Sequence, residues 1–315
     1  MRQDWQSEWQ SYRNWVKSLP GFFLYQILRN DLGWALLNET NREWVHRANL
    51  FINTERPEYA KPGTKQGALT FDNYQEPVND VKGTLLMEYL EQYQPKSVIE
   101  IGPGTGFLTG KIADFPSVSK YTGLDINPNF IEFLQPRLEK LAERKPGFEF
   151  ELIAGDFKEE EMAPGDSVIF LSAVHHIPDR VELFESIARV LQPGGTMFSM
   201  EPTHYIPRML LILRKFLRGN YGKAFRETYR SMGTHNFCTK EEFERVFRKV
   251  GGLSIEECQY IRFEFPPVAK LFLRALLHRR GVRRSPEGWF ILDGKNHPLR
   301  FFSGRMSLVA RRSQP

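Results

Sequence analysis

The stretch VIEIGPGTGFLTG, residues 98–110, places an acid, Glu100, directly before three glycines at every second position. Glycine has no Cβ, so a turn of this kind lets the backbone approach a nucleotide closely. A dinucleotide site needs G-x-G-x-x-G, and a phosphate loop needs Gly-Lys followed by Ser or Thr. Here Phe107 stands at the sixth position and Ile112 follows Lys111. An acid before the turn also repels phosphate, whereas it suits a ligand that carries an ammonium and a sulfonium.

The pattern E-x-G-x-G-x-G, from Glu100 to Gly106, resembles the glycine-rich turn of the class I S-adenosylmethionine-dependent methyltransferases. Four further segments follow in that family's order. YTGLDINPN places Asp125 19 residues after Gly106, and AGDF follows the next predicted strand. DSVIFLSAVHHIPD is close to a segment of the ubiquinone- and sterol-type members, and LQPGGTMFSMEP resembles the turn and fifth strand. The resemblance covers roughly residues 80–200.

This resemblance implies S-adenosyl-L-methionine as the cofactor. The Asp125 carboxylate is expected to accept both ribose hydroxyls, although the same side chain could instead cap a helix at 128–144. Asp156 matches the family residue that binds the adenine amino group, and Phe157 one that lies against the ring. Tyr74 stands where many members place an aromatic side chain over the cofactor. The expected cofactor residues are Glu100, Gly102, Gly104, Gly106, Asp125, Ile126, Asp156, Phe157, Ser172 and Tyr74.

Two histidines, His175 and His176, are the candidate catalytic residues. Methyl transfer displaces a good leaving group, so the protein chiefly aligns the reactants, and a base is needed only where the acceptor loses a proton. One histidine is expected to act as a base or to orient a hydroxyl; alternatively, His176 packs locally and His175 merely lines the pocket. The turn Ser172 to His175 replaces the Asn/Asp-Pro-Pro-Tyr/Phe turn of adenine-N6 methylases. No Asp/His metal cluster is evident, so no metal is expected.

Strands that alternate with helices predict an α/β, Rossmann-like, doubly wound sheet of seven strands with the last strand antiparallel. The expected helices are 106–114, 128–144 and 180–191, and LQPGG is expected to close the last of them before the next strand. The expected strands are 97–101, 120–125, 148–154, 166–172, 195–201, and two later ones near 254–263 and 303–311.

Additions to this core are expected to choose the acceptor. Residues 1–75 carry an aromatic stripe at helical spacing and are read as an N-terminal helical cap on a methyltransferase domain at 76–315. Helical lid insertions are expected at about 203–235 and 264–300. Within them, 205–218 and 267–284 have the pattern of basic amphipathic helices. Such helices either lie on an anionic membrane surface or pack on the sheet as a lid.

Charge and composition limit the kinds of partner and the cellular compartment that we expect. Of the net charge of +5, residues 266–315 contribute +9 and residues 202–232 contribute +6, so the rest carries −10. Two separated cysteines exclude a disulfide scaffold and a structural zinc site, and they suit a reducing, cytoplasmic compartment. No apolar run reaches the ~20 residues of a transmembrane helix. The N-terminus is too polar for a signal peptide.

We therefore expect an enzyme that methylates a lipophilic small molecule, such as a quinone precursor, a terpenoid, a polyketide or a lipid. The first alternative is an RNA or protein methyltransferase that grips a polyanion with the basic C-terminal segment. It ranks lower because the basic helices alternate with aliphatic rather than stacking residues, so nucleic acid is not the expected partner. The second alternative is a non-catalytic binding partner that keeps the fold. The acceptor's identity, the atom methylated and the oligomeric state stay open.

Overall fold

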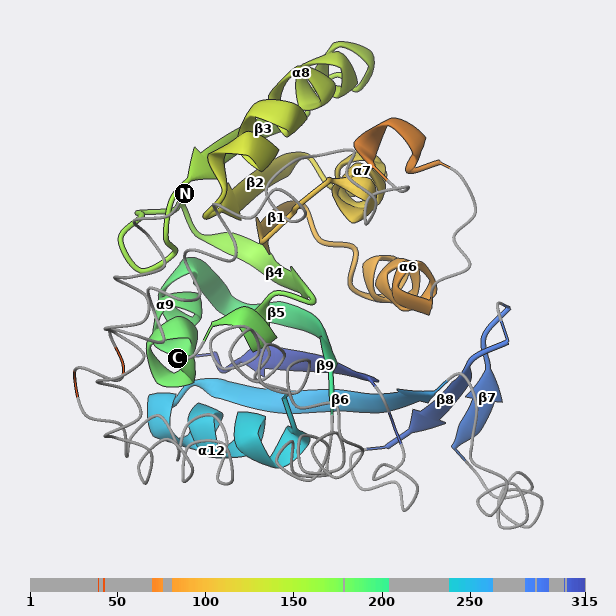
Figure 1. Cartoon of the computed structure of the whole chain (residues 1–315), viewed down its shortest axis with the longest axis vertical. Helices are drawn as coiled ribbons and strands as arrows, with labels where there is room; N and C mark the ends of the chain where they lie inside the picture. Colours follow the sequence, from red (N-terminus) through yellow and green to blue (C-terminus); the bar gives the residue numbers. More distant parts are fainter. Residues whose placement is uncertain are drawn as a thin grey trace, which may run out of the picture.

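The computed structural model describes residues 39, 42, 70–75, 81–177, 179–203, 238–262, 281–286, 288–294, 303 and 305–314. Their strands form one sheet of nine, in the order β3-β2-β1-β4-β5-β9-β6-β8-β7. Figure 1 shows this sheet running through the described part of the chain, with helices packed on both faces. The strands are β1 Ser97–Ile101, β2 Lys120–Asp125, β3 Glu149–Ala154, β4 Gly165–Leu171, β5 Leu191–Pro202, β6 Leu253–Arg262, β7 Val282–Arg284, β8 Phe290–Asp293 and β9 Arg305–Arg312.

The predicted α/β, Rossmann-like class is confirmed as a mixed sheet. Strands β1 to β5 are parallel to one another, whereas β9 runs antiparallel to both of its neighbours, β5 and β6. The expected count of seven is wrong, because the hairpin of β7 and β8 adds two strands beyond β6. These two strands overlap the helical insertion expected at 264–300, and β7 also overlaps the amphipathic helix expected at 267–284. Over these strands the expectation of a helix is wrong.

In the part of the chain that the structure describes, five α-helices cover the two faces. Helices α6 Val81–Tyr93, α7 Phe107–Asp114 and α8 Pro128–Arg144 share one apolar cluster, which includes Leu86, Ile112 and Leu134. Helices α9 Arg180–Val190 and α12 Lys240–Val250 lie on the other face, where Phe184 and Phe247 belong to a second cluster. Because side chains alternate along a strand, β1 supplies Val98 to the first cluster and Ile99 to the second.

Capping residues fix where the helices begin. The Asn127 side chain accepts the Asn129 N–H at 3.1 Å and Pro128 occupies the first turn of α8, so Asn127, not Asp125, caps this helix. Asp179 caps α9. Thr239 caps α12, a helix that the sequence interpretation did not name. The segment LQPGG, which was expected to form a turn, is part of β5 instead. The pairing of β5 with β4 is irregular there, because Gly165 pairs with Leu191 but Ser167 pairs with Thr196.

Several expectations lie outside the described residues or across their limits. The N-terminal cap at 1–75 is described only at residues 39, 42 and 70–75, and the insertion at about 203–235 only at Thr203. The predicted amphipathic helix at 205–218 is not described, so the domain division stays a prediction. Within the described part of the chain, no helix is long and apolar enough to cross a membrane.

Candidate active site

The glycine turn, residues 102–106, joins β1 to α7, and each of its three glycines has a positive φ: 75° at Gly102, 57° at Gly104 and 77° at Gly106. Residues that carry a side chain rarely adopt a positive φ. This explains why glycine occupies every second position of the turn. A Cβ on Gly106 would lie 2.1 Å from Leu134 Cδ2, whereas one on Gly104 would meet nothing within 4 Å. The turn is therefore packed at Gly106 and open at Gly104.

Asp125 ends β2 beside this turn. Its Oδ2 accepts the Gly104 N–H at 3.0 Å and its Oδ1 accepts the Asn127 N–H at 2.9 Å. The residue is 8% exposed. Burial raises the pKa of the Asp125 carboxyl to about 6. The two N–H hydrogen bonds lower this pKa, but their effect is smaller than that of burial. Its carboxylate thus lies at the open part of the turn and retains lone pairs for a ligand.

Glu100 lies beneath the turn and not at its surface. It is 2% exposed, and its Oε2 accepts the Thr109 hydroxyl at 2.7 Å and the Tyr121 hydroxyl at 2.8 Å. Burial raises the pKa of Glu100 to about 7, although both hydroxyls lower it. In the structure this acid joins β1, β2 and α7 to one another, so its contacts are within the protein.

The histidine turn, residues 172–176, follows β4 and is held by a carboxylate from β5. Glu201, 1% exposed, accepts the backbone N–H of Ala173 at 3.1 Å, of Val174 at 2.9 Å and of His175 at 3.3 Å. The His175 ring places Nδ1 2.6 Å from Glu201 Oε2. Burial raises the pKa of Glu201, while the turn's N–H groups and the Arg180 guanidinium lower it.

These two turns touch at the carboxyl edge of the sheet. A Cβ on Gly102 would lie 3.0 Å from the Ala173 Cβ, so the close approach requires glycine. On the other side, the Gly155 N–H donates to the Asp125 carbonyl at 3.1 Å, which brings the turn that carries Asp156 alongside β2. The edge therefore presents, in strand order, the turns after β3, β2, β1 and β4 and the end of β5.

Known proteins that resemble this chain agree with this arrangement. The family model "Methyltransferase domain" matches residues 99–197, from β1 into β5. Demethylmenaquinone methyltransferase of Staphylococcus aureus is 24% identical over 230 residues, which cover 69% of this chain and 88% of that enzyme. Residues 99–197 thus form a methyltransferase domain of the class I S-adenosylmethionine-dependent kind.

One further relative and one solved structure match different shares of this chain. Chondramide synthase CmdD of Chondromyces crocatus is 32% identical over 115 residues, which are 36% of this chain. The chain spans only 3% of that synthase's length. The solved N-methyltransferase NodS of Bradyrhizobium japonicum, in complex with S-adenosyl-L-homocysteine, is 12% identical, with a TM-score of 0.44 over 87% of this chain and 98% of that one.

Most of the predicted cofactor residues of the methyltransferase come together at this edge. The Asp156 Oδ1 accepts the Lys158 N–H at 3.2 Å, and Phe157 packs in the core. Ser172, at a φ of 68°, donates its N–H to Met200. Ile126 lies between Asp125 and the cap of α8.

Tyr74 lies elsewhere in the methyltransferase. Its ring packs against Gly110 in α7, and its hydroxyl donates to Asp114 Oδ2 at 2.9 Å and accepts a bond from Arg144. Asp114 ends α7, whereas the glycine turn precedes that helix. Phe71, another aromatic residue, does contact the turn, since its N–H donates to the Thr105 carbonyl at 3.0 Å.

Sequence interpretation missed Glu201. This residue was quoted only within LQPGGTMFSMEP, and nothing local relates it to a histidine 26 positions earlier. An acid that directly follows the largely apolar run Met197 to Met200 is the sequence signal that could have found it. Such an acid is rarely buried without partners.

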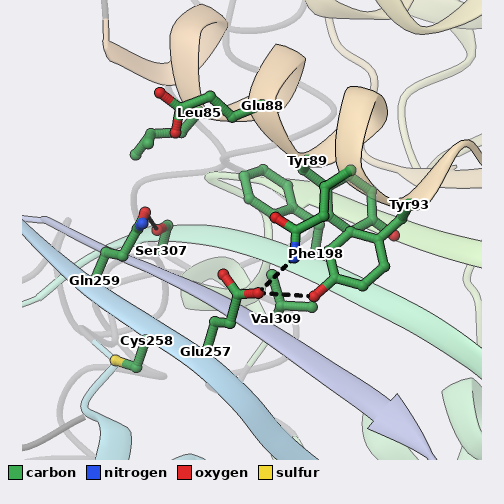
Figure 2. A pocket seen from close by; sticks show the side chains of 11 residues that line it. Leu85, Glu88, Tyr89, Tyr93, Phe198, Glu257, Cys258, Gln259, Ser307 and Val309 are labelled. Carbon is green, nitrogen blue, oxygen red and sulfur yellow. Dashed lines mark hydrogen bonds between the residues drawn. The ribbon is translucent and has the colours of Figure 1, made fainter. Parts of the chain in front are cut away.

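A small cleft of about 50 Å³ lies away from this edge, between α6 and the strands β5, β9 and β6. Figure 2 shows Tyr93 and Glu257 joined across it, with a hydroxyl-to-Oε1 distance of 2.9 Å. A volume of this size holds only a few water molecules. The cleft is too small for an acceptor.

Among the described residues, no group of His, Cys, Asp and Glu could hold a metal ion.

Proposed function

We propose that the methyltransferase transfers the methyl group of S-adenosyl-L-methionine to a lipophilic small molecule, at an atom that gives up its proton to His175. The observation that carries this proposal is the contact of 2.6 Å between His175 Nδ1 and Glu201 Oε2, at the end of the sheet where the glycine turn lies. A buried carboxylate that orients an imidazole is the usual arrangement of a general base.

The glycine turn and Asp125 fit the cofactor. The open space at Gly104 admits a ligand against the backbone, and the adjacent carboxylate suits ribose hydroxyls. When bound there, S-adenosyl-L-methionine supplies an activated methyl group on a sulfonium. Asp156 and Phe157, on the neighbouring turn, would hold the adenine.

The tautomer of His175 follows from the bonds to Glu201. Three backbone N–H groups can only donate, so the carboxylate is occupied as an acceptor and the imidazole is best placed to donate its Nδ1–H as well. The Nε2 atom is then unprotonated and can receive a proton from a hydroxyl or amine. Glu201 stabilises the imidazolium that forms.

A lipophilic acceptor is supported by the sheet and by one relative. The ends of β5 and β6 are level, because Arg305 in β9 pairs with both Pro202 and Ile261. The segments that follow these strands in the sequence, 204–237 and 263–280, are both rich in leucine and phenylalanine. A relative named for demethylmenaquinone, a quinone, agrees with that composition.

The acceptor class can be tested with methyl-labelled S-adenosyl-L-methionine and cell extracts separated into lipid, aqueous, RNA and protein fractions. We expect label in the lipid fraction, with a mass gain of one methyl group on one compound. Label in RNA or protein instead would reject the small-molecule proposal and favour the polyanion alternative.

The base can be tested by His175→Gln and Glu201→Gln in the same assay. We expect each to lower the rate about 10²- to 10⁴-fold, the usual contribution of a general base, with little change in cofactor affinity. The matched control is Glu257→Gln, which changes a carboxylate on β6, away from the histidine turn. If His176→Gln abolished transfer and His175→Gln did not, the base would be assigned to the wrong histidine.

The cofactor site can be tested separately by calorimetry with S-adenosyl-L-methionine. We expect Asp125→Ala to weaken binding at least about tenfold, because hydrogen bonds to a charged group are lost. Asp114→Ala, at the far end of α7, should leave the affinity unchanged. Equal affinity in wild type and Asp125→Ala would remove the ribose assignment.

A further inference from the structure

Arg180 is a buried cation close to the histidine turn. It is the first residue of α9, it is 2% exposed, and it heads the largest fully buried side chains of the described residues. Its guanidinium donates from Nη1 to the Cys238 Sγ at 2.9 Å. The Cys238 N–H in turn donates to the Pro202 carbonyl at 3.2 Å, so Arg180 reaches the end of β5 directly after Glu201.

The groups around this guanidinium are mostly acidic. Two buried carboxyls face it, Glu201 from β5 and Glu242 from α12, and each stabilises the charged form of Arg180. The thiol of Cys238 is the third group, and burial raises its pKa. His175 contacts Glu201 through its Nδ1, and the ring centroids of His175 and His176 are 4.0 Å apart. A guanidinium cannot lose its proton in a protein, so its charge is permanent.

We propose that Arg180 is a positioning residue for the His175–Glu201 pair: its fixed charge keeps Glu201 ionised and His175 free to receive a proton. The inference rests on the proposed function, in which His175 is the base. A base must be unprotonated before it acts. Three N–H bonds from the histidine turn also favour the carboxylate, but they are dipoles, and Arg180 supplies a full charge.

The direction of the effect follows from electrostatics. Without the cation, the pair holds an additional proton more tightly, whether this proton resides on the imidazole or on the carboxyl. The pair would then stay protonated to a higher pH, and methyl transfer would lose its base at neutral pH. Removal of Glu242, the other acid that faces Arg180, has the opposite effect on the proton affinity of the pair. The charge of Arg180 is then less neutralised, so it disfavours the additional proton more strongly.

The experiment follows the imidazole resonances of histidine-labelled full-length protein by NMR from pH 5 to 9, without cofactor or acceptor. His175→Gln assigns the signal. In Arg180→Met we expect the midpoint of His175 protonation to rise by about 1 pH unit. In Arg180→Lys, which keeps the charge, the midpoint should remain near the wild-type value.

Glu242→Gln is the second variant, because its amide can keep the capping bond to Thr239 N–H that Glu242 makes at 3.4 Å. Here the midpoint should fall, and this result decides the matter if Arg180→Met does not fold. An unchanged midpoint in folded Arg180→Met, or an unchanged or raised one in Glu242→Gln, would overturn the proposal. The proposed function fails by a different result, full methyl transfer in His175→Gln.

Discussion

The glycine turn and the histidine turn lie side by side at one edge of the sheet, yet they are built in different ways. The glycine turn is shaped by backbone conformation, with positive φ at three glycines and open space at Gly104. The histidine turn is shaped by a buried side chain, since Glu201 accepts three of its N–H groups and contacts its imidazole. One turn is made to face a ligand, and the other depends on the protein interior.

The acids of the two turns differ accordingly. Asp125 accepts two N–H groups at the open side of the glycine turn, so its remaining lone pairs are available to a ligand. Glu100, beneath that turn, has only hydroxyl partners, which can rotate and accept a bond as readily as donate one. Glu201 has backbone partners that only donate, so its role in the histidine turn requires a charge.

Glu201→Ala should break the histidine turn more severely than Asp125→Ala breaks the glycine turn. Removal of Glu201 leaves three N–H groups, an imidazole and the Arg180 charge without their buried carboxylate, which typically costs about 3 to 5 kcal/mol of unfolding free energy. For Asp125→Ala we expect a loss of about 1 to 2 kcal/mol, because only the Gly104 and Asn127 N–H groups lose this acceptor. Urea unfolding measures both.

Equal losses in these two variants would contradict the comparison, because both carboxylates would then be structural. Asp125→Ala should combine modest destabilisation with weak cofactor binding. Glu201→Ala should combine severe destabilisation with normal cofactor affinity in whatever fraction is folded.

The pH dependence of stability should report on Glu100. Its pKa is about 7 in the folded protein against an ordinary value of 4.5, so the folded state binds more protons than the unfolded state between these values. Stability therefore falls as the pH rises from 4.5 to 7 and levels off above that, by about 3 kcal/mol from this group. Asp125, with a raised pKa of about 6, adds to the same trend.

Glu100→Gln should remove most of this loss when the unfolding free energy is compared at pH 5 and pH 7.5. Tyr121→Phe removes one hydroxyl that favours the carboxylate, so it should make the pH dependence steeper. If the slope in Glu100→Gln matched wild type, Glu100 would already be ionised at pH 5 and would not differ from Glu201 in the way proposed.

The glycine turn could be predicted because its causes are close together in sequence. Three glycines within five residues, and an acid at the end of the next strand, are visible without knowledge of the fold. The positions of β1, β2, α7 and α8 followed from the same local patterns to within one residue at each end.

The histidine turn could be predicted only in part, because its partners come from distant segments. His175 was identified, but its partner Glu201 comes from β5, 26 positions later in the sequence. The hairpin of β7 and β8 was missed for a related reason. Its strands have three and four residues, too short for a clear alternation, and their pairing depends on the edge that β6 offers.

Two glycines of one turn offer the finest distinction, between packing and ligand access. Gly106→Ala places a Cβ 2.1 Å from Leu134 Cδ2 and 3.2 Å from the Phe71 Cβ, at a φ of 77°, so we expect a loss of about 2 to 3 kcal/mol of unfolding free energy.

Gly104→Ala meets nothing within 4 Å, so only the cost of the left-handed conformation, about 1 kcal/mol, should appear in unfolding. Calorimetry should nevertheless show weaker S-adenosyl-L-methionine binding in this variant, because the new methyl occupies the space where the ligand approaches the backbone. If Gly104→Ala bound the cofactor as well as wild type, the open side of the turn would not face the ligand, and Asp125 would lose its assigned role as well.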